Sequence, residues 1–416
     1  MAGAPQGAAG EPRAGRAPAT AALVTRRAGV VAYTSSEVGR LAPRAPIELE
    51  VDTVASLLDT AGVSTGEIDG WVTVPHGYLH AGAPIRGQRL AERLGISTRL
   101  LLEVDIGGGS SLYALHVALS AVEDGDADAV VISAAQLERG QAGPPYLDRL
   151  ALLASMYGDF LAPYGVVQAV PIYALSAQRY MHRHDLSDED VSWVTVRLRE
   201  SAAGNPHAEF RDRPVTLDEV MTSRMVAPPL RLLHCAPWSD GAAAVLLAGE
   251  DWARARAMPF APVTGFAAAH SSSNFLPFSG DIDRFPWIRE ATQRALVRAG
   301  RTLGQVDVAE IYGAFAPQEL MTYEEMGFFA DGEAARAVRA GLTAPAGHIG
   351  LNPSGGRLGV GHPPPATPLL EVGEVFDQLT GRAGSRQRAR ARVGLVQAEH
   401  GMMNGCCVMV LEAGNN

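Results

Sequence analysis

The segment from Asn352 to Pro363 carries the densest set of residues able to do chemistry in this sequence. It reads Asn-Pro-Ser-Gly-Gly-Arg-Leu-Gly-Val-Gly-His-Pro. Its glycines allow main-chain amides to come close to a ligand. His362 stands on a tight turn before an expected helix, where an imidazole can reach into a cleft and exchange protons. One histidine beside a proline is by itself typical of a surface turn, so this interpretation depends on the whole string.

The identity of the basic residues limits the types of reaction that this protein can catalyse. All 35 of them are arginines, because the sequence contains no lysine. A Schiff base on a carbonyl substrate would have only the N-terminal amine, which excludes a lysine-type aldolase and a pyridoxal enzyme. A phosphate-binding P-loop also lacks its lysine. Hydroxyl, imidazole, carboxylate, thiol and main-chain groups remain.

The net charge and the number of cysteines indicate which kinds of partner and which cellular compartment to expect. With 45 acidic and 35 basic side chains the formal net charge is −10, which argues against nucleic acid as a partner. No apolar run approaches the about 18 residues that a membrane helix needs. The 3 cysteines are odd in number and two are adjacent, so we expect no disulfide framework and a cytoplasmic location.

Two stretches of the chain repeat one scheme, in which a glycine-rich loop precedes an apolar helix. In the first, a strand at 101–104, glycines at 107–109, a helix at 112–122 and a strand at 129–133 predict a β-α-β crossover. In the second, a strand at 308–312, the loop ending at Pro363 and a helix from about 366 to 379 follow the same order. We therefore predict an internally duplicated α/β fold. A helix at 46–61 and a final hairpin that pairs 393–397 with 408–412 complete the expected elements.

The domain organisation follows from this repeat. At 416 residues and 47% hydrophobic content the chain can bury a large core. Residues 1–27 are rich in Ala, Gly, Pro and Arg without apolar periodicity, so we predict a disordered tail there. We expect an N-terminal half at 28–260, with an inserted loop region at about 135–230, and a C-terminal half at 261–416.

The loop ending in His362 resembles the NPxGGxxxxGHP loop of the thiolase superfamily, in which that histidine works at the acyl-thioester carbon. Further segments resemble family motifs in the same order: Asn205–Ala208 of the lipid-transfer branch, Cys235–Ala244 with its (S/T)DGAAA stretch, and Glu310–Ala316 at a strand end. The resemblance covers roughly residues 28–416. It implies a duplicated, five-layered αβαβα sandwich, usually a homodimer, and a CoA thioester as the substrate without a further cofactor or metal.

The sequence departs from the family in the first glycine loop. A degradative thiolase carries a nucleophilic cysteine at the start of the buried helix, where the helix dipole lowers the thiol pKa. Aligning residues 125–128 with the similar family stretch puts Gly108 at that position. An acyl-cysteine intermediate therefore cannot form there. Ser110 or Ser111 could replace the nucleophile, but we favour a helix-capping role for both, because serine is a preferred N-cap.

Thiolases also have a second reactive cysteine, in a CxGGxxG loop. Matching Gly405 to the last glycine of that loop places Glu399 and His400 near the position of the missing cysteine. Both are candidates for proton transfer, although either could be an ordinary polar loop residue. Cys406 and Cys407 fall at the start of the final strand, one facing each side, where a small apolar residue in a buried strand is the simpler interpretation.

The predicted site combines proton carriers with main-chain donors. Imidazole and tyrosine hydroxyl groups suit proton transfer, and amides at a helix start can hold a developing oxyanion. This set suits making or breaking a carbon–carbon bond beside an acyl-CoA carbonyl without covalent attachment. We predict Tyr312, His362, His400 and Glu399 as catalytic, Gly108, Gly109 and Gly405 as oxyanion-binding main chain, and Ser110, Asn352, Gly355 and Gly356 as substrate-binding.

This chemistry is similar to that of cysteine-lacking thiolase homologues in steroid side-chain degradation, which are retro-aldolases on β-hydroxyacyl-CoA. Their tyrosine matches Tyr312, their second tyrosine falls where this chain has His362, and they work with an OB-fold/zinc-ribbon (DUF35-type) partner subunit. Two alternatives stay open. The protein could be an acyltransferase that uses Ser110 or a cysteine, or a non-catalytic protein that binds lipid or acyl-CoA.

Overall fold

The computed structural model describes residues 26–77, 85–139, 161–166, 168–271, 281–401 and 403–414. The first half contains β1 (Ala28–Ser35), α1 (Pro46–Ala61), β2 (Gly70–Thr73), α2 (Arg86–Leu94), β3 (Leu100–Glu103), α3 (Ser110–Glu123), β4 (Ala129–Gln136), β7 (Gly241–Gly249) and α8 (Glu250–Ala255). The inserted region between β4 and β7 contains α5 (Ala169–Arg183), α6 (Asp188–Ala202), α7 (Leu217–Thr222), β5 (Met225–Ala227) and β6 (Leu230–Arg231). Most of the predicted disordered tail lies outside the described residues.

The chain continues with β8 (Ala261–His270), and the domain boundary predicted at residue 260 stays a prediction. After β8 come α9 (Pro286–Ala299), β9 (Val308–Ile311), α10 (Ala316–Met326), α11 (Ala334–Arg339), β10 (Gly350–Leu351), α12 (Gly356–Val360), α13 (Thr367–Leu379), β11 (Val393–Glu399) and β12 (Gly405–Glu412). The helix predicted at 46–61 has those bounds, and the final hairpin pairs Val393 with Glu412 as predicted.

The strand order shows the duplication directly. The sheet runs β10-β9-β11-β12-β8-β1-β7-β4-β2-β3. Read outward from the middle of the sheet, the two halves have the same pattern. In the first half β7 pairs antiparallel with β4, which pairs parallel with β2, and in the second half β12 pairs antiparallel with β11, which pairs parallel with β9. The halves join where Gly29 and Val30 pair with Pro262 and Ala261. A Cβ on Gly29 would overlap the Ala261 carbonyl oxygen, so this crossing requires glycine.

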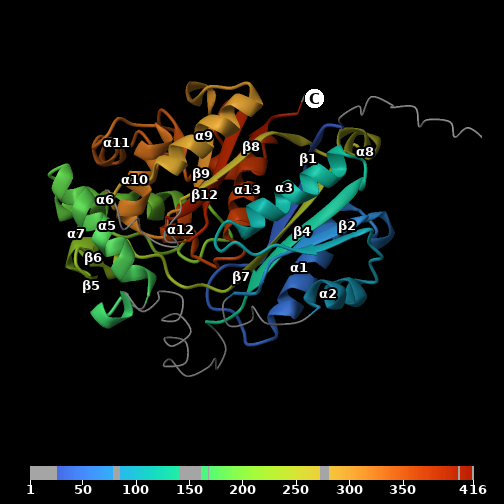
Figure 1. The fold of residues 1–416 in the computed structure, drawn as a ribbon, viewed down its shortest axis with the longest axis horizontal. Coiled ribbons are helices and arrows are strands. Elements are labelled where there is room, and N and C mark those ends of the chain that lie inside the picture. Colours follow the sequence, from blue (N-terminus) through green and yellow to red (C-terminus); the bar gives the residue numbers. More distant parts are fainter. Residues whose placement is uncertain are drawn as a thin grey trace, which may run out of the picture.

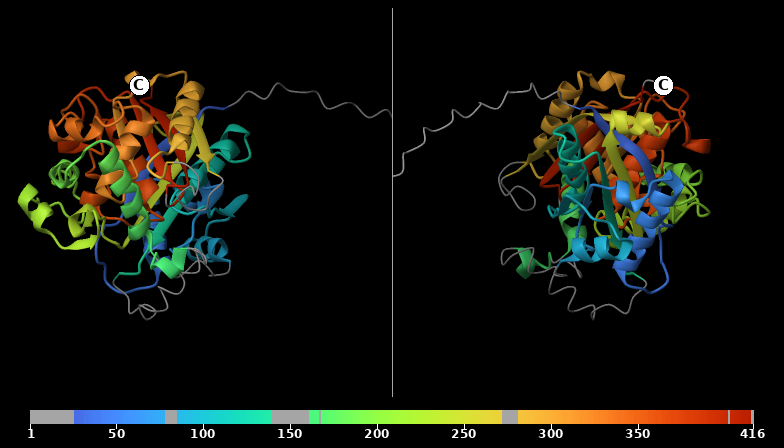
Figure 2. Two further views of the ribbon diagram at one scale, coloured as in Figure 1. Left: turned by 60° about the vertical axis from the view of Figure 1, so that its left-hand side comes forward. Right: turned by 90° about the vertical axis from the view of Figure 1, so that its right-hand side faces the viewer.

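Helices form three layers around the two half-sheets, which gives the predicted αβαβα order. α1 packs on the outer face of the first half-sheet, α3 and α13 lie between the half-sheets, and α9 and α10 cover the second (Figures 1 and 2). β7 is buried on both faces, because Val245 faces α3 and α13 while Leu246 faces α1. Successive side chains of a strand point to opposite faces, so its uninterrupted apolar run is what a central layer needs.

The inserted region packs against the second half, where α6 lies beside α11 and α12 (Figure 1). The contact is close because glycines face it. A Cβ on Gly355 would lie 2.6 Å from the Ala202 Cβ, and one on Gly359 would lie 2.6 Å from the Leu198 carbonyl oxygen. The loop that carries His362 is thereby held between α6 and α13.

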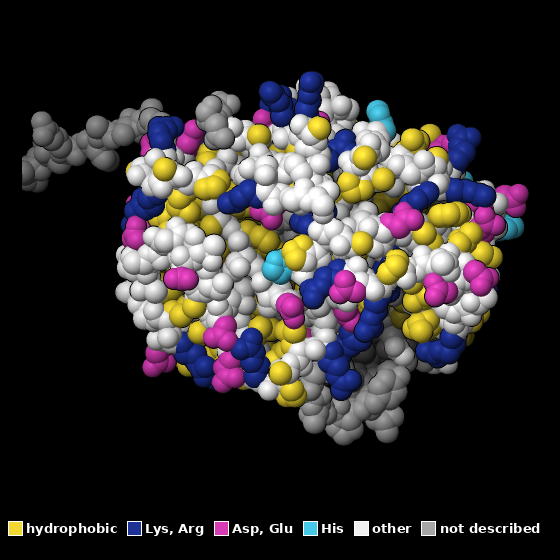
Figure 3. Space-filling view, turned by 180° about the vertical axis from the view of Figure 1, so that it is seen from behind, with side chains coloured by type: hydrophobic (Ala, Val, Ile, Leu, Met, Phe, Trp, Pro, Cys, Tyr) yellow, Lys and Arg dark blue, Asp and Glu magenta, His cyan; other side chains and the backbone are white. Residues whose placement is uncertain are grey.

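Arginine and acidic side chains are interspersed with scattered apolar ones on the face seen in Figure 3. Among the described residues several arginines form ion pairs with carboxylates, such as Arg301 with Glu412 and Arg256 with Glu67. Among the described residues, no helix has the length and apolar content to cross a membrane.

The interior beneath β9 holds several carboxyl groups. Glu310, Glu319 and Glu371 are fully buried, as is the guanidinium of Arg357. Burial raises the pKa of Glu310 to about 7 and that of Glu319 to about 8, and it also raises the pKa of Glu371. The side-chain amide of Asn352 donates to both Glu319 oxygens, at 3.0 and 2.9 Å.

The raised pKa of Glu319 predicts a pH-dependent stability. The folded protein keeps on this carboxyl a proton that the unfolded chain releases above its pKa of 4.5, so this contribution to stability falls as the pH rises from about 4.5 to about 8. Glu319→Gln keeps an acceptor for Asn352 and carries no charge. We expect the variant to be more stable than the parent at about pH 8.5, by a few kcal/mol at most.

Urea unfolding at about pH 5.5 and about pH 8.5 measures this difference. Glu333→Gln is the matched control, because the Glu333 side chain is 44% exposed. If Glu319→Gln and Glu333→Gln lose stability equally between the two pH values, Glu319 does not carry the buried proton.

Candidate active site

The two halves are in contact through main-chain atoms, because the glycine loop before α3 packs directly on the end of β11. Gly107 has a φ of 85°, and a Cβ on it would overlap the His400 carbonyl oxygen. The Gly108 N–H donates to that same oxygen at 2.8 Å. A Cβ on Gly108 would lie 2.7 Å from the Glu399 carbonyl oxygen. Both positions therefore require glycine, and the Gly108 amide predicted to hold an oxyanion is already bonded within the protein.

Tyr312 follows β9 and projects toward this loop. Its N–H donates to the Gln397 carbonyl at 3.1 Å, which fixes the main chain at the strand end. Its buried hydroxyl lies 2.6 Å from Nε2 of His362, with the two rings at 85°. A Cβ on Gly108 would lie 3.3 Å from this hydroxyl. The tyrosine thus occupies the space that a nucleophilic side chain at residue 108 would need.

His362 is held by the segment that precedes β7. Its N–H donates to the Ser239 hydroxyl at 3.1 Å, and the Ser239 N–H donates to its carbonyl at 3.0 Å. The Trp238 ring stands edge-on to the imidazole at 6.3 Å, and its indole N–H donates to Glu138 at 3.0 Å. Ser239 belongs to the (S/T)DGAAA stretch, so its motif was visible in the sequence, whereas its bonds to His362 were not.

The electrostatics of the pair favour a neutral imidazole. Burial lowers the pKa of His362 to about 3, and the positive charge of Arg357 acts in the same direction. At neutral pH the ring therefore carries one proton, and in the tautomer with that proton on Nδ1 the Tyr312 hydroxyl can donate to Nε2. The Tyr312 hydroxyl and His362 Nε2 can therefore exchange a proton, and the lowered pKa of His362 means that the histidine holds it only transiently.

His400 lies on the other side of the glycine loop. Its ring is buried between those of Tyr113 and His270, at 5.6 and 5.3 Å, and burial lowers its pKa to about 4. Among the described residues its Nε2 has no hydrogen-bond partner. A Cβ on Gly109 would lie 3.0 Å from the His400 ring, and one on Gly405 would overlap it. The structure therefore brings together His400, Gly109 and Gly405, three of the predicted residues.

Glu399 presents only its main chain to the loop. Its buried carboxylate accepts from the Tyr173 hydroxyl and from the Met403 N–H, the latter at 3.2 Å. Burial raises its pKa to about 7. Tyr173 belongs to α5 and packs on Phe315 at 4.3 Å. No sequence pattern pointed to Tyr173, because its partner Glu399 stands 226 residues away.

The predicted serine caps are wrong. Gly109 occupies the N-cap of α3, and Ser110 is the first helical residue. The Ser110 hydroxyl donates to the Gly107 carbonyl at 2.6 Å and accepts from the Ile106 N–H at 2.9 Å, while the Ser111 hydroxyl donates to the Pro365 carbonyl. A side chain cannot cap from residue 109, because its Cβ would crowd His400. The two serines instead fix the glycine loop and the segment before α13.

The residues predicted to bind substrate in the second loop are buried. Asn352 bonds Glu319, and its side-chain oxygen accepts from the Ile311 N–H at 2.6 Å. Gly355 packs on α6, and a Cβ on Gly356 would lie 3.1 Å from the Asn352 amide nitrogen. All three shape the loop that carries His362. A direct role of Asn352, Gly355, Gly356 or Ser110 in substrate binding stays a prediction.

The thiols of the chain lie in buried environments that keep them protonated. Burial raises the pKa of Cys235 to about 12, and it also raises the pKa values of Cys406 and Cys407. Each thiol donates to a main-chain carbonyl, at 3.3 Å for Cys235 and 3.7 Å for Cys406 and Cys407. Cys406 and Cys407 face opposite sides of β12, as predicted.

One described cluster has the composition of a metal site. Ligand atoms of His184, Glu324 and Asp331 lie within 4.8 Å of one another. Glu324 already accepts from the Tyr180 hydroxyl at 2.8 Å, and Asp331 pairs with Arg284. Because these partners use the ligand atoms, we assign the cluster to an ion-pair network.

The packing at Gly108 predicts a specific defect. Gly108→Ala would place a methyl group against the Glu399 carbonyl and the Tyr312 hydroxyl. Overpacking of this kind costs about 1–3 kcal/mol. Thermal unfolding should show that loss, whereas Gly304→Ala, with open space around its Cβ, should not. Equal stability of the two variants would contradict the close approach of the halves.

Comparisons with known proteins agree on one family. Residues 269–413 match the family described as Thiolase C-terminal domain-like. An acetyl-CoA acetyltransferase from Methanothermobacter thermautotrophicus is 31% identical over 375 residues, 89% of this chain and 95% of that protein. A 17-hydroxy-3-oxo-4-pregnene-20-carboxyl-CoA lyase from Mycobacterium tuberculosis is 30% identical over 346 residues, 81% of this chain and 88% of that protein.

A solved structure extends this likeness to three dimensions. An Ltp2-ChsH2(DUF35) aldolase superimposes with a TM-score of 0.81 at 27% identity, over 93% of this chain and 98% of the compared one. The duplicated sheet and the two glycine loops described above are consistent with this match. The chain therefore belongs to the thiolase superfamily, in its lipid-transfer, thiolase-like branch.

Proposed function

We propose that this protein breaks or makes a carbon–carbon bond beside an acyl-CoA thioester, in a retro-aldol reaction without an acyl-cysteine intermediate. The observation that carries the proposal is the 2.6 Å contact between the Tyr312 hydroxyl and His362 Nε2, directly in front of Gly108. The relatives named as a CoA lyase and an aldolase support an acyl-CoA enzyme of this kind. The reaction needs the CoA thioester and no further cofactor.

The first step is removal of a proton from the β-hydroxyl group of the substrate. Tyr312 takes that proton while its own proton moves to Nε2 of His362. The bond between the α and β carbons then breaks, and its electron pair moves into the thioester to form an enolate. The β carbon leaves as an aldehyde or ketone. Return of the proton through the same pair to the α carbon gives the shortened acyl-CoA.

The enolate oxygen needs hydrogen-bond donors in place of water. Among the described residues the Gly109 N–H and His400 Nε2 have no hydrogen-bond partner, and a Cβ on Gly109 would lie 3.0 Å from the His400 ring. His400 is neutral at physiological pH because burial lowers its pKa to about 4, and its Nε2 tautomer can donate. We assign the oxyanion to these two groups, since the Gly108 amide is bonded to the His400 carbonyl.

We also propose that the enzyme is a cytoplasmic homodimer that works with an OB-fold/zinc-ribbon (DUF35-type) subunit. The compared aldolase is named with a DUF35 component, which supports such a partner. Free thiols at Cys235, Cys406 and Cys407 suit a reducing compartment.

The proton-carrying pair predicts the effect of two substitutions. Tyr312→Phe removes the hydroxyl, and His362→Ala removes its acceptor. Loss of general acid–base catalysis lowers rates by about 10²- to 10⁴-fold, and we expect this loss in kcat with a smaller change in KM. The assay follows release of aldehyde or ketone and of shortened acyl-CoA from β-hydroxyacyl-CoA thioesters, with the partner subunit present.

The control is His182→Ala, because this histidine of α5 is exposed and lies far along the chain from Tyr312 and His362. It should retain the parent rate. Unchanged rates in both Tyr312→Phe and His362→Ala, with folded protein, would show that other groups move the protons.

The acetyltransferase relative favours a second candidate, an acyl transfer through a covalent intermediate. Ser110 and the three cysteines are the available nucleophiles. Intact-mass spectrometry after incubation with acetyl-CoA and with β-hydroxyacyl-CoA separates the two reactions. We expect no acyl adduct, because the thiol pKa values are raised and the Ser110 hydroxyl is engaged. A stoichiometric adduct would establish acyl transfer instead.

A further inference from the structure

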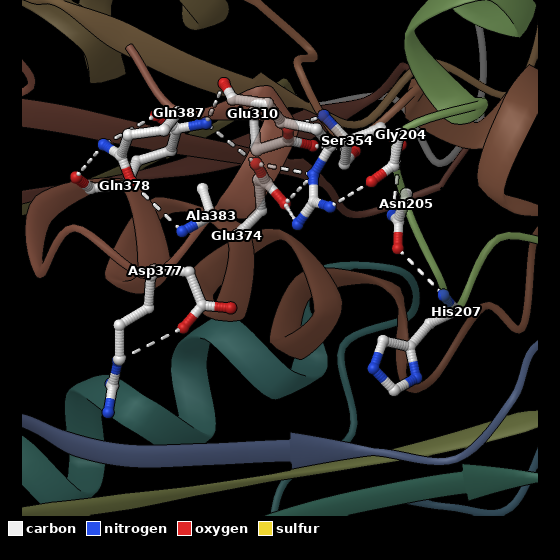
Figure 4. A network of polar contacts seen from close by, with 12 residues as sticks. Gly204, Asn205, His207, Glu310, Ser354, Glu374, Asp377, Gln378, Ala383 and Gln387 are labelled. Atoms are coloured by element: carbon white, nitrogen blue, oxygen red, sulfur yellow. Dashed lines mark hydrogen bonds and ion pairs between the residues drawn. The ribbon is translucent and has the colours of Figure 1, made fainter. Parts of the chain in front are cut away.

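The segment that begins with the lipid-transfer motif runs beside the loop that carries His362. At the start of this segment the Asn205 side-chain amide donates to the Ser354 carbonyl at 3.1 Å (Figure 4). A few residues later the Glu209 N–H donates to the Val360 carbonyl at 3.0 Å. The segment therefore holds the loop at two points, and the second lies two residues before the catalytic histidine.

The Glu209 carboxylate uses its two oxygens in different directions. Oε1 accepts from Arg139 at 2.5 Å, and the Arg139 side chain is 36% exposed. Oε2 accepts from the Ser239 hydroxyl at 2.6 Å, and Ser239 is fully buried. An ion pair near the surface needs only the first of these contacts. The second turns one carboxylate oxygen toward the segment that holds His362.

The Ser239 hydroxyl connects this carboxylate to His362. A hydroxyl has one proton to donate and two lone pairs that accept. The proton is directed to Glu209, because the other acceptor, the Pro237 carbonyl, is 3.4 Å away. The oxygen then accepts from the His362 N–H at 3.1 Å. Donation to a charged group polarises the hydroxyl, so Glu209 both orients it and strengthens its bond to His362.

The main chain next to His362 packs against the same two side chains. Gly361 has a φ of 101°, and a Cβ on it would lie 2.8 Å from Ser239 Oγ and 3.1 Å from Glu209 Oε2. Ser239 also donates its own N–H to the His362 carbonyl at 3.0 Å. The backbone is thus fixed on both sides of the His362 Cα. Only the two side-chain torsions remain to place Nε2 against Tyr312.

We propose that Glu209 is a positioning residue, which acts through the Ser239 hydroxyl to hold the His362 ring against Tyr312. The role rests on the proposed function, because the position of His362 affects a rate only if this histidine carries a proton. The contact to be preserved is the 2.6 Å distance from the Tyr312 hydroxyl to His362 Nε2. Proton transfer requires a hydrogen bond of this length, so a small rotation of the main chain at His362 would weaken it.

Glu209→Ala removes the carboxylate and keeps the main-chain bond to Val360. We expect kcat for release of shortened acyl-CoA to fall by about 10- to 100-fold. KM should change little, because the lost group acts on proton transfer and not on substrate binding. Glu412→Ala is the matched control and should retain the parent kcat. Its side chain is 17% exposed, pairs with Arg301 and accepts from the Thr264 hydroxyl at 3.1 Å, at the C-terminal end of β12.

A double-mutant cycle shows whether Glu209 acts through Ser239. Ser239→Ala removes the hydroxyl and keeps the main-chain N–H that donates to His362. If the carboxylate acts through that hydroxyl, Glu209→Ala should change kcat little once residue 239 is alanine. Fully additive losses in kcat would overturn the proposal, because Glu209 would then affect the reaction by another route.

The NMR signal of the His362 ring reports its position without an assay of activity. The full-length protein is used, and His362→Ala assigns the signal. We expect Glu209→Ala to shift this signal and Glu412→Ala to leave it unchanged. Glu209→Gln serves if Glu209→Ala does not fold. It keeps the volume of the side chain but offers one acceptor oxygen to two donors, Arg139 and Ser239, so the same shift is expected.

Two further results would contradict the role of Glu209. These are a His362 signal that does not move in the Glu209 variants, and equal values of kcat in Glu209→Ala and Glu412→Ala. The NMR measurement separates this role from the reaction itself. If the signal moves but no lyase activity is found, the proposed function fails and the positioning stands. If the protein is an active lyase and neither the signal nor kcat responds, the positioning fails alone.

Discussion

The main-chain contact between the first glycine loop and the end of β11 is the constraint on which the site depends. The Gly108 N–H donates to the His400 carbonyl at 2.8 Å, and side chains at Gly107 or Gly108 would overlap that strand end. This contact places an α3 loop of the first half against β9 and β11 of the second. Tyr312 then fills the space in front of residue 108. A nucleophilic side chain and this tyrosine cannot share the position.

Burial determines the protonation states around that contact. Removing water disfavours charged forms, so His362 and His400 are neutral at physiological pH and the three thiols stay protonated. The site is thus built from neutral proton carriers and main-chain donors. Those groups can move a proton and hold an enolate without first forming a thiolate.

The loop between Asn352 and His362 is positioned by groups that contribute no catalytic chemistry. Asn352 joins it to Glu319 and β9, Gly355 sets it on α6, and Ser239 holds its last residue by two hydrogen bonds. Three carboxyl groups and Arg357 are buried beneath it. Such a polar interior costs stability, and it fixes the loop from below while the inserted region fixes it from the side.

The sequence by itself predicted the duplicated fold, the helix at 46–61, and Tyr312 and His362 as residues of one site, because helix periodicity, glycine stops and short motifs are local signals. The contact between these two side chains was seen only in the structure. Only the tertiary structure decided the rest. Glu399 and His400 are adjacent in sequence, but their side chains point in different directions, because successive strand residues face opposite sides. The Glu399 carboxylate accepts from Tyr173, whereas the His400 ring packs against Gly109. Gly109, and not Ser110, is the N-cap of α3, and Trp238 lies beside His362. Both arrangements depend on contacts between segments more than 100 residues apart. No local sequence pattern specifies which distant segment will pack against a given residue, and it is this packing that leaves room only for glycine at position 108.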